Sequence, residues 1–182
     1  GVLLSEGRNF WGKEAYDLSR AVDILVSLPE VDANKIGAIG HSAGANVMSF
    51  FVFFDSRVKA SVANCGTSEI NSYWEYNRPG RLFGSFAMPN SVRLGIDTHD
   101  FIGKIAPRAY FIIHGAHQWG DGSPDPHDKI TENELEIFKN AYLEENKGNK
   151  IETLLFEENG GRHSFPNGVK EKAYYWLDKH LK

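Results

Sequence analysis

The chain has 182 residues, of which 41% are apolar, 24% charged and 13% aromatic, and its net charge is −4. These values are typical of one globular domain and exclude a disordered chain or a collagen. The longest apolar stretch lies within residues 47–54, far below the roughly 18 residues of a membrane span, so we expect no membrane partner. With 20 basic and 24 acidic residues we also expect no nucleic acid partner.

The first part of the chain predicts two helices and two strands. Apolar residues at helical spacing, ended by Pro29, predict an amphipathic helix over about residues 13–28. The small, β-compatible run at residues 35–40 predicts a strand. Residues 43–54 are apolar on nearly every side and predict a buried helix, and alternating residues at 57–64 predict a second strand.

The second part begins with a segment of different character. Residues 66–107 are rich in Gly, Asn, Ser, Pro and aromatic side chains without a sustained period, which indicates an excursion forming a lid or pocket. Residues 108–114 and 151–156 then predict the third and fourth strands, with a helix at 131–146 between them. A last helix is expected near residues 168–181.

This alternation of strands and helices predicts the fold class. Strands separated by helices indicate an α/β fold with a mostly parallel sheet, covered by helices on both faces. The whole chain, residues 1–182, is expected to form one domain of this kind.

The most informative motif is Gly-His-Ser-Ala-Gly at residues 40–44, where a predicted strand meets a predicted helix. A sharp turn there would expose the Ser42 hydroxyl above the sheet, and flanking glycines would allow close packing. The N–H of Ala43 would then be the first donor to a developing oxyanion. A plain glycine-rich turn with a capping serine is the alternative interpretation.

A serine nucleophile needs a base and an acid downstream of it. His163 lies in the loop at residues 160–166, after the last strand, and is the candidate base. Asp121 and Asp125 follow the third strand and are the candidate acids. Asp121 is favoured because it lies nearer the strand end between two glycines, although either residue could simply form a turn.

The same segment also offers nitrogen and oxygen ligands. Six such residues are His114, His117, Asp121, Asp125, His127 and Asp128. Their spacing matches no metal fingerprint, so we expect neither a metal nor a cofactor. Residues 97–100, Asp-Thr-His-Asp, are expected to form a solvated or hydrogen-bonded loop, and the single Cys65 cannot form an internal disulfide.

These motifs resemble the α/β-hydrolase superfamily, and within it the branch of dienelactone-hydrolase-like and carbohydrate-esterase-like proteins, with relatives of acetyl xylan and glucuronoyl esterases. The resemblance is carried by residues 29–32, 35–37, 40–44, 55–60, 105–108, 163–166 and 173–177. It implies a serine carboxylic-ester hydrolase that needs no cofactor. In such an enzyme Ser42 attacks, His163 transfers the proton, Asp121 orients the imidazole and the N–H of Ala43 binds the oxyanion.

The chain departs from the family pattern in two places. Gln118 and Trp119 stand where the family usually has its acid, so Asp121 requires a short insertion. Only 41 residues precede Ser42, so the first half of the family's sheet is absent, together with the loop that gives the second oxyanion donor. We therefore expect further N-terminal residues, or a second chain in a homo-oligomer, to cover the sheet edge.

Three functions agree with these observations. The first is an esterase acting on a small-molecule or carbohydrate ester, since aromatic residues that could stack on sugar rings occur at Tyr73, Trp74, Tyr76 and Trp119. The second is a peptidase of the same fold. The third is a degenerate, non-catalytic module that binds or packs against a partner.

Overall fold

The computed structural model describes residues 6–70, 91–117, 126–145 and 150–182. Its centre is a four-stranded sheet in the order β1-β2-β3-β4, in which each strand pairs in parallel with the next one along the chain. The strands are β1 (Ile36–His41), β2 (Val58–Asn64), β3 (Ala109–Gly115) and β4 (Ile151–Phe156). Each agrees with its predicted range to within one residue, and the α/β fold class is confirmed.

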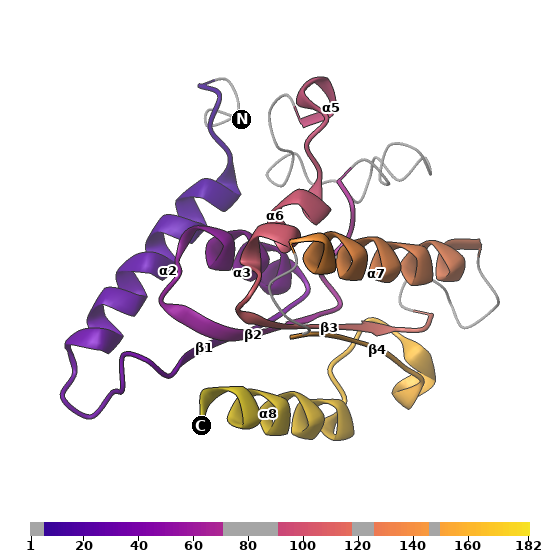
Figure 1. Cartoon of the computed structure of the whole chain (residues 1–182). Helices are drawn as coiled ribbons and strands as arrows, with labels where there is room; N and C mark the ends of the chain where they lie inside the picture. Colours follow the sequence, from indigo (N-terminus) through magenta and orange to yellow (C-terminus); the bar gives the residue numbers. More distant parts are fainter. Residues whose placement is uncertain (1–5, 71–90, 118–125, 146–149) are drawn as a thin grey trace.

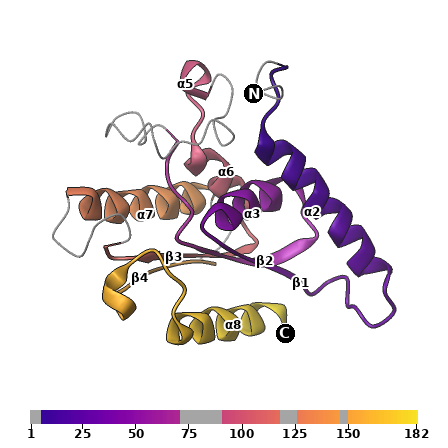
Figure 2. The ribbon, with the colours of Figure 1, turned by 180° about the vertical axis from the view of Figure 1, so that it is seen from behind.

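Helices cover both faces of the sheet. On one face lie α3, α6 and α7, while α8 lies on the other, and α2 packs against α3 (Figures 1 and 2). The helices are α2 (Phe10–Ser27), α3 (Ala43–Phe54), α5 (Ser91–Leu94), α6 (Thr98–Ile105), α7 (Pro126–Glu144) and α8 (Asn167–Leu181), with a short 3₁₀ helix η1 (Glu158–Gly161). Within the described ranges, none of these helices combines the length and apolarity of a membrane-crossing segment.

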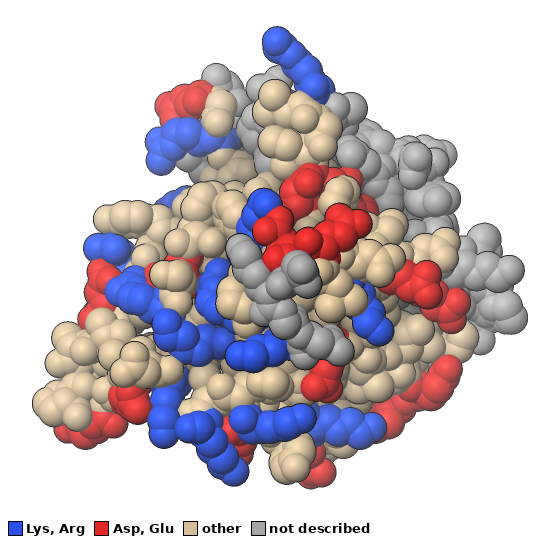
Figure 3. Space-filling view, in the orientation of Figure 1, with Lys and Arg blue, Asp and Glu red and all other residues tan. Residues whose placement is uncertain are grey.

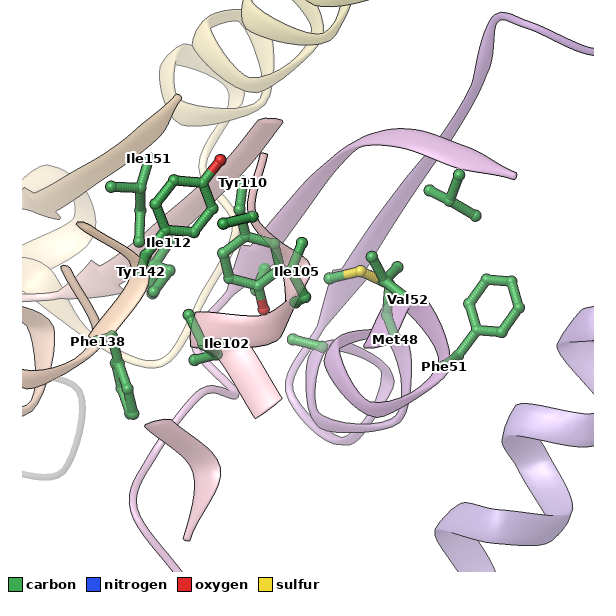
Figure 4. Packing of buried hydrophobic residues seen from close by; sticks show 14 of the residues in the cluster. Met48, Phe51, Val52, Ile102, Ile105, Tyr110, Ile112, Phe138, Tyr142 and Ile151 are labelled. Atoms are coloured by element: carbon green, nitrogen blue, oxygen red, sulfur yellow. The ribbon is translucent and has the colours of Figure 1, made fainter. Parts of the chain in front are cut away.

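The main core lies between the sheet and the layer of α3, α6 and α7. Figure 4 shows side chains from α3, α6 and α7 meeting those of β3 and β4. Fully buried members include Val52, Ile105, Tyr110 and Phe138. The prediction that the whole helix 43–54 is buried is wrong at its end, because Phe54 is 64% exposed although its ring makes T-shaped contacts with Phe50 and Phe53.

Two helices begin earlier than predicted. The α2 helix starts at Phe10 because the Asn9 side chain accepts a hydrogen bond from the N–H of Gly12 at 2.8 Å, which caps the first turn. The α7 helix starts at Pro126, a residue whose fixed φ suits the first position of a helix. Both starts are local capping effects, which apolar periodicity does not report.

The excursion at 66–107 is more ordered at its end than predicted. Residues 97–100 are not a loop but the capped start of α6, since Asp97 accepts from the N–H of Thr98 and Asp100 accepts from the N–H of Asp97. Asp97 also accepts from the N–H of Ile70 at 2.5 Å. The two ends of the excursion are therefore fastened to each other beside α6.

In the described part of the chain, β1 forms one edge of the sheet. An open groove of about 650 Å³ lies beside it, between α2 and α3, and it is lined mainly by apolar side chains such as Leu18, Leu25 and Val47. Ile39 on β1 remains 39% exposed. In the space-filling view of Figure 3, basic side chains lie in a row along the lower edge and acidic side chains gather above the centre.

Candidate active site

Ser42 lies in a sharp turn between β1 and α3. Its backbone has φ 58° and ψ −127°, a conformation that non-glycine residues rarely adopt. The turn is held on both sides, because the N–H of Ser42 donates to the Asn64 carbonyl on β2 at 2.9 Å and its own carbonyl accepts from Ala45 and Asn46 at the start of α3. The predicted strained strand-to-helix turn is therefore present, and its strain is stabilised by the neighbouring strand.

Two glycines make room for this turn, but only one of them is a glycine that the motif predicted for this role. A Cβ on Gly40 would overlap the backbone of Gly44, as expected for a glycine before the turn. A Cβ on Gly44 would meet no described atom within 4 Å, so its predicted role in close packing is wrong. The second required glycine is Gly66, where a Cβ would overlap the carbonyl of Ser42.

His163 lies next to the serine although 121 residues separate them. Its Nε2 is 2.8 Å from the Ser42 Oγ, which is hydrogen-bonding distance. The loop reaches back over the sheet through three residues of positive φ: Asn159, Gly160 and Gly161. Since an imidazole at this distance can take the hydroxyl proton, the pair has the geometry of a nucleophile and its base.

The candidate acids Asp121 and Asp125 lie outside the described residues. What the structure describes is where their segment begins. The N–H of Ala116 donates to the Phe156 carbonyl at 3.0 Å, and the N–H of His117 donates to the Gly161 carbonyl at 2.9 Å. The chain after β3 therefore leaves the sheet alongside the loop that carries His163.

Ala43 is the first residue of α3. Its N–H is one of the first four of the helix, which have no carbonyl partner within the helix and which carry the positive end of the helix dipole. This N–H directly follows Ser42, as the oxyanion prediction requires.

Metal-ligand side chains do not gather in the described ranges: no group of three or more His, Cys, Asp or Glu residues there could hold an ion. The six candidates from the sequence are spread over the fold: His114 lies in β3 and His117 follows it, while His127 and Asp128 lie in α7. Asp121 and Asp125 lie outside the described residues. The aromatic residues at 73, 74, 76 and 119 also lie outside the described residues.

Sequence reasoning missed the turn after β2. Cys65 there also has a positive φ, 53°, and its N–H donates to the Ile113 carbonyl at 2.7 Å. Asn64, fully buried, directs its amide toward both His41 and the His163 loop. The only signal in the sequence was the Asn-Cys-Gly run that ends the predicted strand, since glycine there marks a close approach of two backbones.

Comparison with known families gives one partial match. Residues 18–88 match the family model described as BAAT / Acyl-CoA thioester hydrolase C terminal. This range contains β1, the Ser42 turn, α3 and β2. A protein named as a hydrolase, YtaP of Bacillus subtilis (strain 168), is 26% identical over 115 residues, which are 63% of this chain and 38% of that protein.

Solved structures match over nearly the whole chain. A glucuronoyl esterase from Solibacter usitatus aligns with a TM-score of 0.70 and 17% identity over 92% of this chain and 48% of its own. A carbohydrate esterase family 15 glucuronoyl esterase from Caldicellulosiruptor kristjansonii aligns with a TM-score of 0.67 and 21% identity over 92% of this chain and 49% of its own. This chain thus spans about half the length of these structures, and the likeness establishes a shared fold.

Proposed function

Since the chain has the α/β-hydrolase fold, we propose that it is the nucleophile-bearing part of a serine hydrolase that cleaves a carboxylic ester through an acyl-enzyme. The observation that carries this proposal is the 2.8 Å approach of His163 Nε2 to the Oγ of Ser42, on a residue with strained backbone. Strain at a polar, half-exposed residue is typical of functional sites. The matches to hydrolases add support from outside the chain.

The mechanism follows from these positions. His163 takes the Ser42 proton through Nε2 while Oγ attacks the ester carbonyl, and the N–H of Ala43 donates to the resulting oxyanion. The protonated His163 then gives its proton to the leaving alcohol as the carbon–oxygen bond breaks. Water, deprotonated by the same imidazole, attacks the acyl-enzyme and releases the acid and Ser42.

We assign the orienting acid to Asp121, with Asp125 as the second candidate. A carboxylate on the Nδ1 side of His163 would hold the tautomer whose Nε2 can accept the serine proton, and it would stabilise the imidazolium. The supporting observation is the pair of backbone hydrogen bonds that starts the segment beside the His163 loop. Asp121 is the nearer of the two to that anchored start.

For the substrate we propose an ester of a small molecule or a carbohydrate. Glucuronoyl esterases are prominent among the structural matches, and the matching family model is that of acyl-CoA thioester hydrolases. Both kinds of substrate present an acyl carbonyl to the nucleophile. An ester is also less demanding than an amide for a serine with one oxyanion donor in view, because an alkoxide leaves more readily than an amide anion.

A fluorophosphonate probe tests this function directly, because it reacts only with an activated serine. We expect the folded chain to be labelled at Ser42, as read by peptide mass spectrometry, and both Ser42→Ala and His163→Ala to abolish labelling. Ser56→Ala, at an exposed serine away from the site, is the matched control and keeps full labelling. A cooperatively folded sample that is never labelled would instead support the non-catalytic module.

Hydrolysis of matched substrates separates the esterase from the peptidase. We expect release of p-nitrophenol from p-nitrophenyl acetate, and no release of p-nitroaniline from the corresponding anilide. Methyl esters of glucuronic acid against acetylated sugars then distinguish the two carbohydrate ester classes. Faster turnover of the anilide would move the assignment to the peptidase.

A further inference from the structure

A hydrogen-bond cluster centred on the buried Asn64 lies beside the candidate base, with the more exposed His41 as one of its members. Asn64 ends β2 with its side chain fully buried, and its Nδ2 is 2.9 Å from the Ser164 carbonyl oxygen and 2.7 Å from the His41 Nδ1. The His41 ring lies 5.1 Å from the His163 ring, centre to centre. The mechanism above uses neither Asn64 nor His41.

The direction of each hydrogen bond can be worked out from its partners. The Ser164 carbonyl oxygen can only accept, so the Asn64 end that faces it must be the amide nitrogen. That nitrogen has a second N–H, which points at the Nδ1 of His41. Nδ1 must therefore accept, and the His41 ring is the neutral tautomer with its proton on Nε2.

The charges around His41 favour the same state. Burial lowers the pKa of His41, the backbone of Asn64 opposes this to a smaller extent, and the positive charge of Lys170 on α8 adds to the lowering. The His163 ring also lies against it. Burial raises the pKa of Cys65, which contacts Asn64 and Ser164, to about 11, so this thiol is uncharged. Among the described residues, the groups that shift the pKa of His41 include no carboxylate that could hold a proton on its Nδ1.

Packing connects this neutral ring to the loop of the base. The His41 ring is stacked on Phe165 with centroids 6.0 Å apart and an interplanar angle of 21°. Asn64 binds the carbonyl of Ser164, the residue between His163 and Phe165. Two independent contacts, one polar and one aromatic, thus fix the residues that immediately follow His163.

We propose that Asn64 and His41 are positioning residues for His163: they hold its loop over Ser42, and Asn64 keeps the adjacent His41 ring uncharged while His163 becomes an imidazolium. The proposal rests on the proposed function of Ser42 and His163. A charged His41 would repel the imidazolium at ring-contact distance, so the uncharged ring lowers the cost of the proton transfer.

The test compares Asn64→Ala with His41→Phe, which keeps the stacking on Phe165 but cannot accept or carry a proton. We expect Asn64→Ala to lower kcat for p-nitrophenyl acetate by 10- to 100-fold with KM changed less than threefold. On the acidic side of its pH profile, the slope of log kcat against pH should rise from one to two. A slope of two means that two protons inactivate the enzyme, because His41 can now be protonated as well as His163. His41→Phe should lower kcat by less than 10-fold and keep a slope of one. The variant that carries both substitutions should also have a slope of one, because it has no His41 to protonate.

A second readout is independent of turnover. In ¹H–¹⁵N spectra of the imidazoles at pH 7, His41 should show a protonated Nε2 and an unprotonated Nδ1, and Asn64→Ala should remove this preference. Asn167→Ala, at an exposed residue three positions beyond Ser164, is the control for the loop and changes neither readout.

The outcomes separate the two claims. Suppose that the fluorophosphonate labels Ser42. The positioning role alone would then be overturned by a His41 that is protonated at Nδ1, or by a slope of log kcat against pH that stays at one in Asn64→Ala. Equal losses in kcat without any change of slope would also overturn it, since a purely structural role predicts that result. Absence of Ser42 labelling in the folded wild type would overturn the proposed function and this role together.

Discussion

Ser42 and Cys65 occupy equivalent places at the carboxyl ends of neighbouring strands, and both have positive φ values, 58° and 53°. In each turn the backbone N–H donates to the last part of the next strand: Ser42 to the Asn64 carbonyl and Cys65 to the Ile113 carbonyl. Their side chains differ completely. The Ser42 hydroxyl is half-exposed and lies 2.8 Å from an imidazole, while Cys65 is 1% exposed.

The environment of each side chain explains the difference. Burial raises the pKa of Cys65 to about 11, so its sulfur stays a thiol. The thiol donates to the Asn64 Oδ1 and the Ser164 carbonyl oxygen, which accept a hydrogen bond but are not bases that could deprotonate it. A thiol is intrinsically the better nucleophile, yet here the serine has the base. A strained backbone therefore only directs a side chain out of its turn. Solvent access and a nearby base are what make that side chain reactive.

The largest expected effect comes from removing the nucleophile in the Ser42 turn or its base, His163. Ser42→Ala and His163→Ala should each lower p-nitrophenyl acetate turnover by about 10³-fold or more, and the double variant should be scarcely worse, because the two residues act as one unit. Cys65→Ala should retain most of the activity. Losses that multiply in the double variant would contradict a shared mechanism.

The acid comes next. Asp121→Asn should lower kcat by about 10²- to 10⁴-fold without unfolding the protein, because the imidazole loses its orienting partner. Asp125→Asn should be mild and serves as the matched control. The reverse pattern would move the role to Asp125, and two mild variants would exclude both.

The second turn can be tested through its thiol. Alkylation of Cys65 by iodoacetamide at pH 8 should be about 100-fold slower than that of an exposed cysteine, since its pKa is raised from 9.0 to about 11. Because the folded pKa is raised, the protonated thiol contributes stability that is fully present below about pH 9 and lost as the pH rises toward 11. Fast alkylation under native conditions would show that the thiol is accessible.

The packing of the first turn against the second gives a smaller effect. Gly66→Ala should lower the free energy of unfolding by about 1–3 kcal/mol or more, because its Cβ overlaps the Ser42 carbonyl. Gly44→Ala should be neutral, or stabilising by up to about 1 kcal/mol, since alanine is the better helix former. Urea unfolding of both variants measures the two values, and equal losses would be inconsistent with the described packing.

The last prediction concerns the strands that carry the two turns, because β2 lies between two neighbours while β1 is an edge in the described sheet. We propose that further residues of the same protein or a second copy cover the β1 edge and its apolar groove. The 182-residue chain by itself should then have a mass in light scattering above 20.4 kDa, and Ile39→Lys should reduce it. A soluble, cooperatively folded monomer would contradict this.

Much of the fold could be predicted from the sequence because its strands are short apolar runs with clear ends. The motif at residues 40–44 and the position of His163 after the last strand predicted two side chains that the structure brings together. Such motifs work because the geometry they require is local: a turn at one strand end and a loop after another.

The remaining features depend on contacts between distant parts of the chain. The roles of Asn64 and Gly66 could not be predicted, because each acts on a backbone atom of a different strand or loop. The α6 helix escaped detection because eight residues are too few for a visible period, and its start depends on one capping box. The Gly44 prediction failed for the same reason: steric need is set by neighbours, which a motif does not specify.

The 121-residue separation between Ser42 and His163 has a consequence for how activity appears during folding. The base is in the last quarter of the chain, and the strained turn at Ser42 donates a hydrogen bond to β2, so both depend on long-range contacts. Helices can form much earlier from local contacts alone. In refolding experiments the recovery of fluorophosphonate labelling should therefore follow the recovery of helical signal, and labelling would report completed assembly of the sheet.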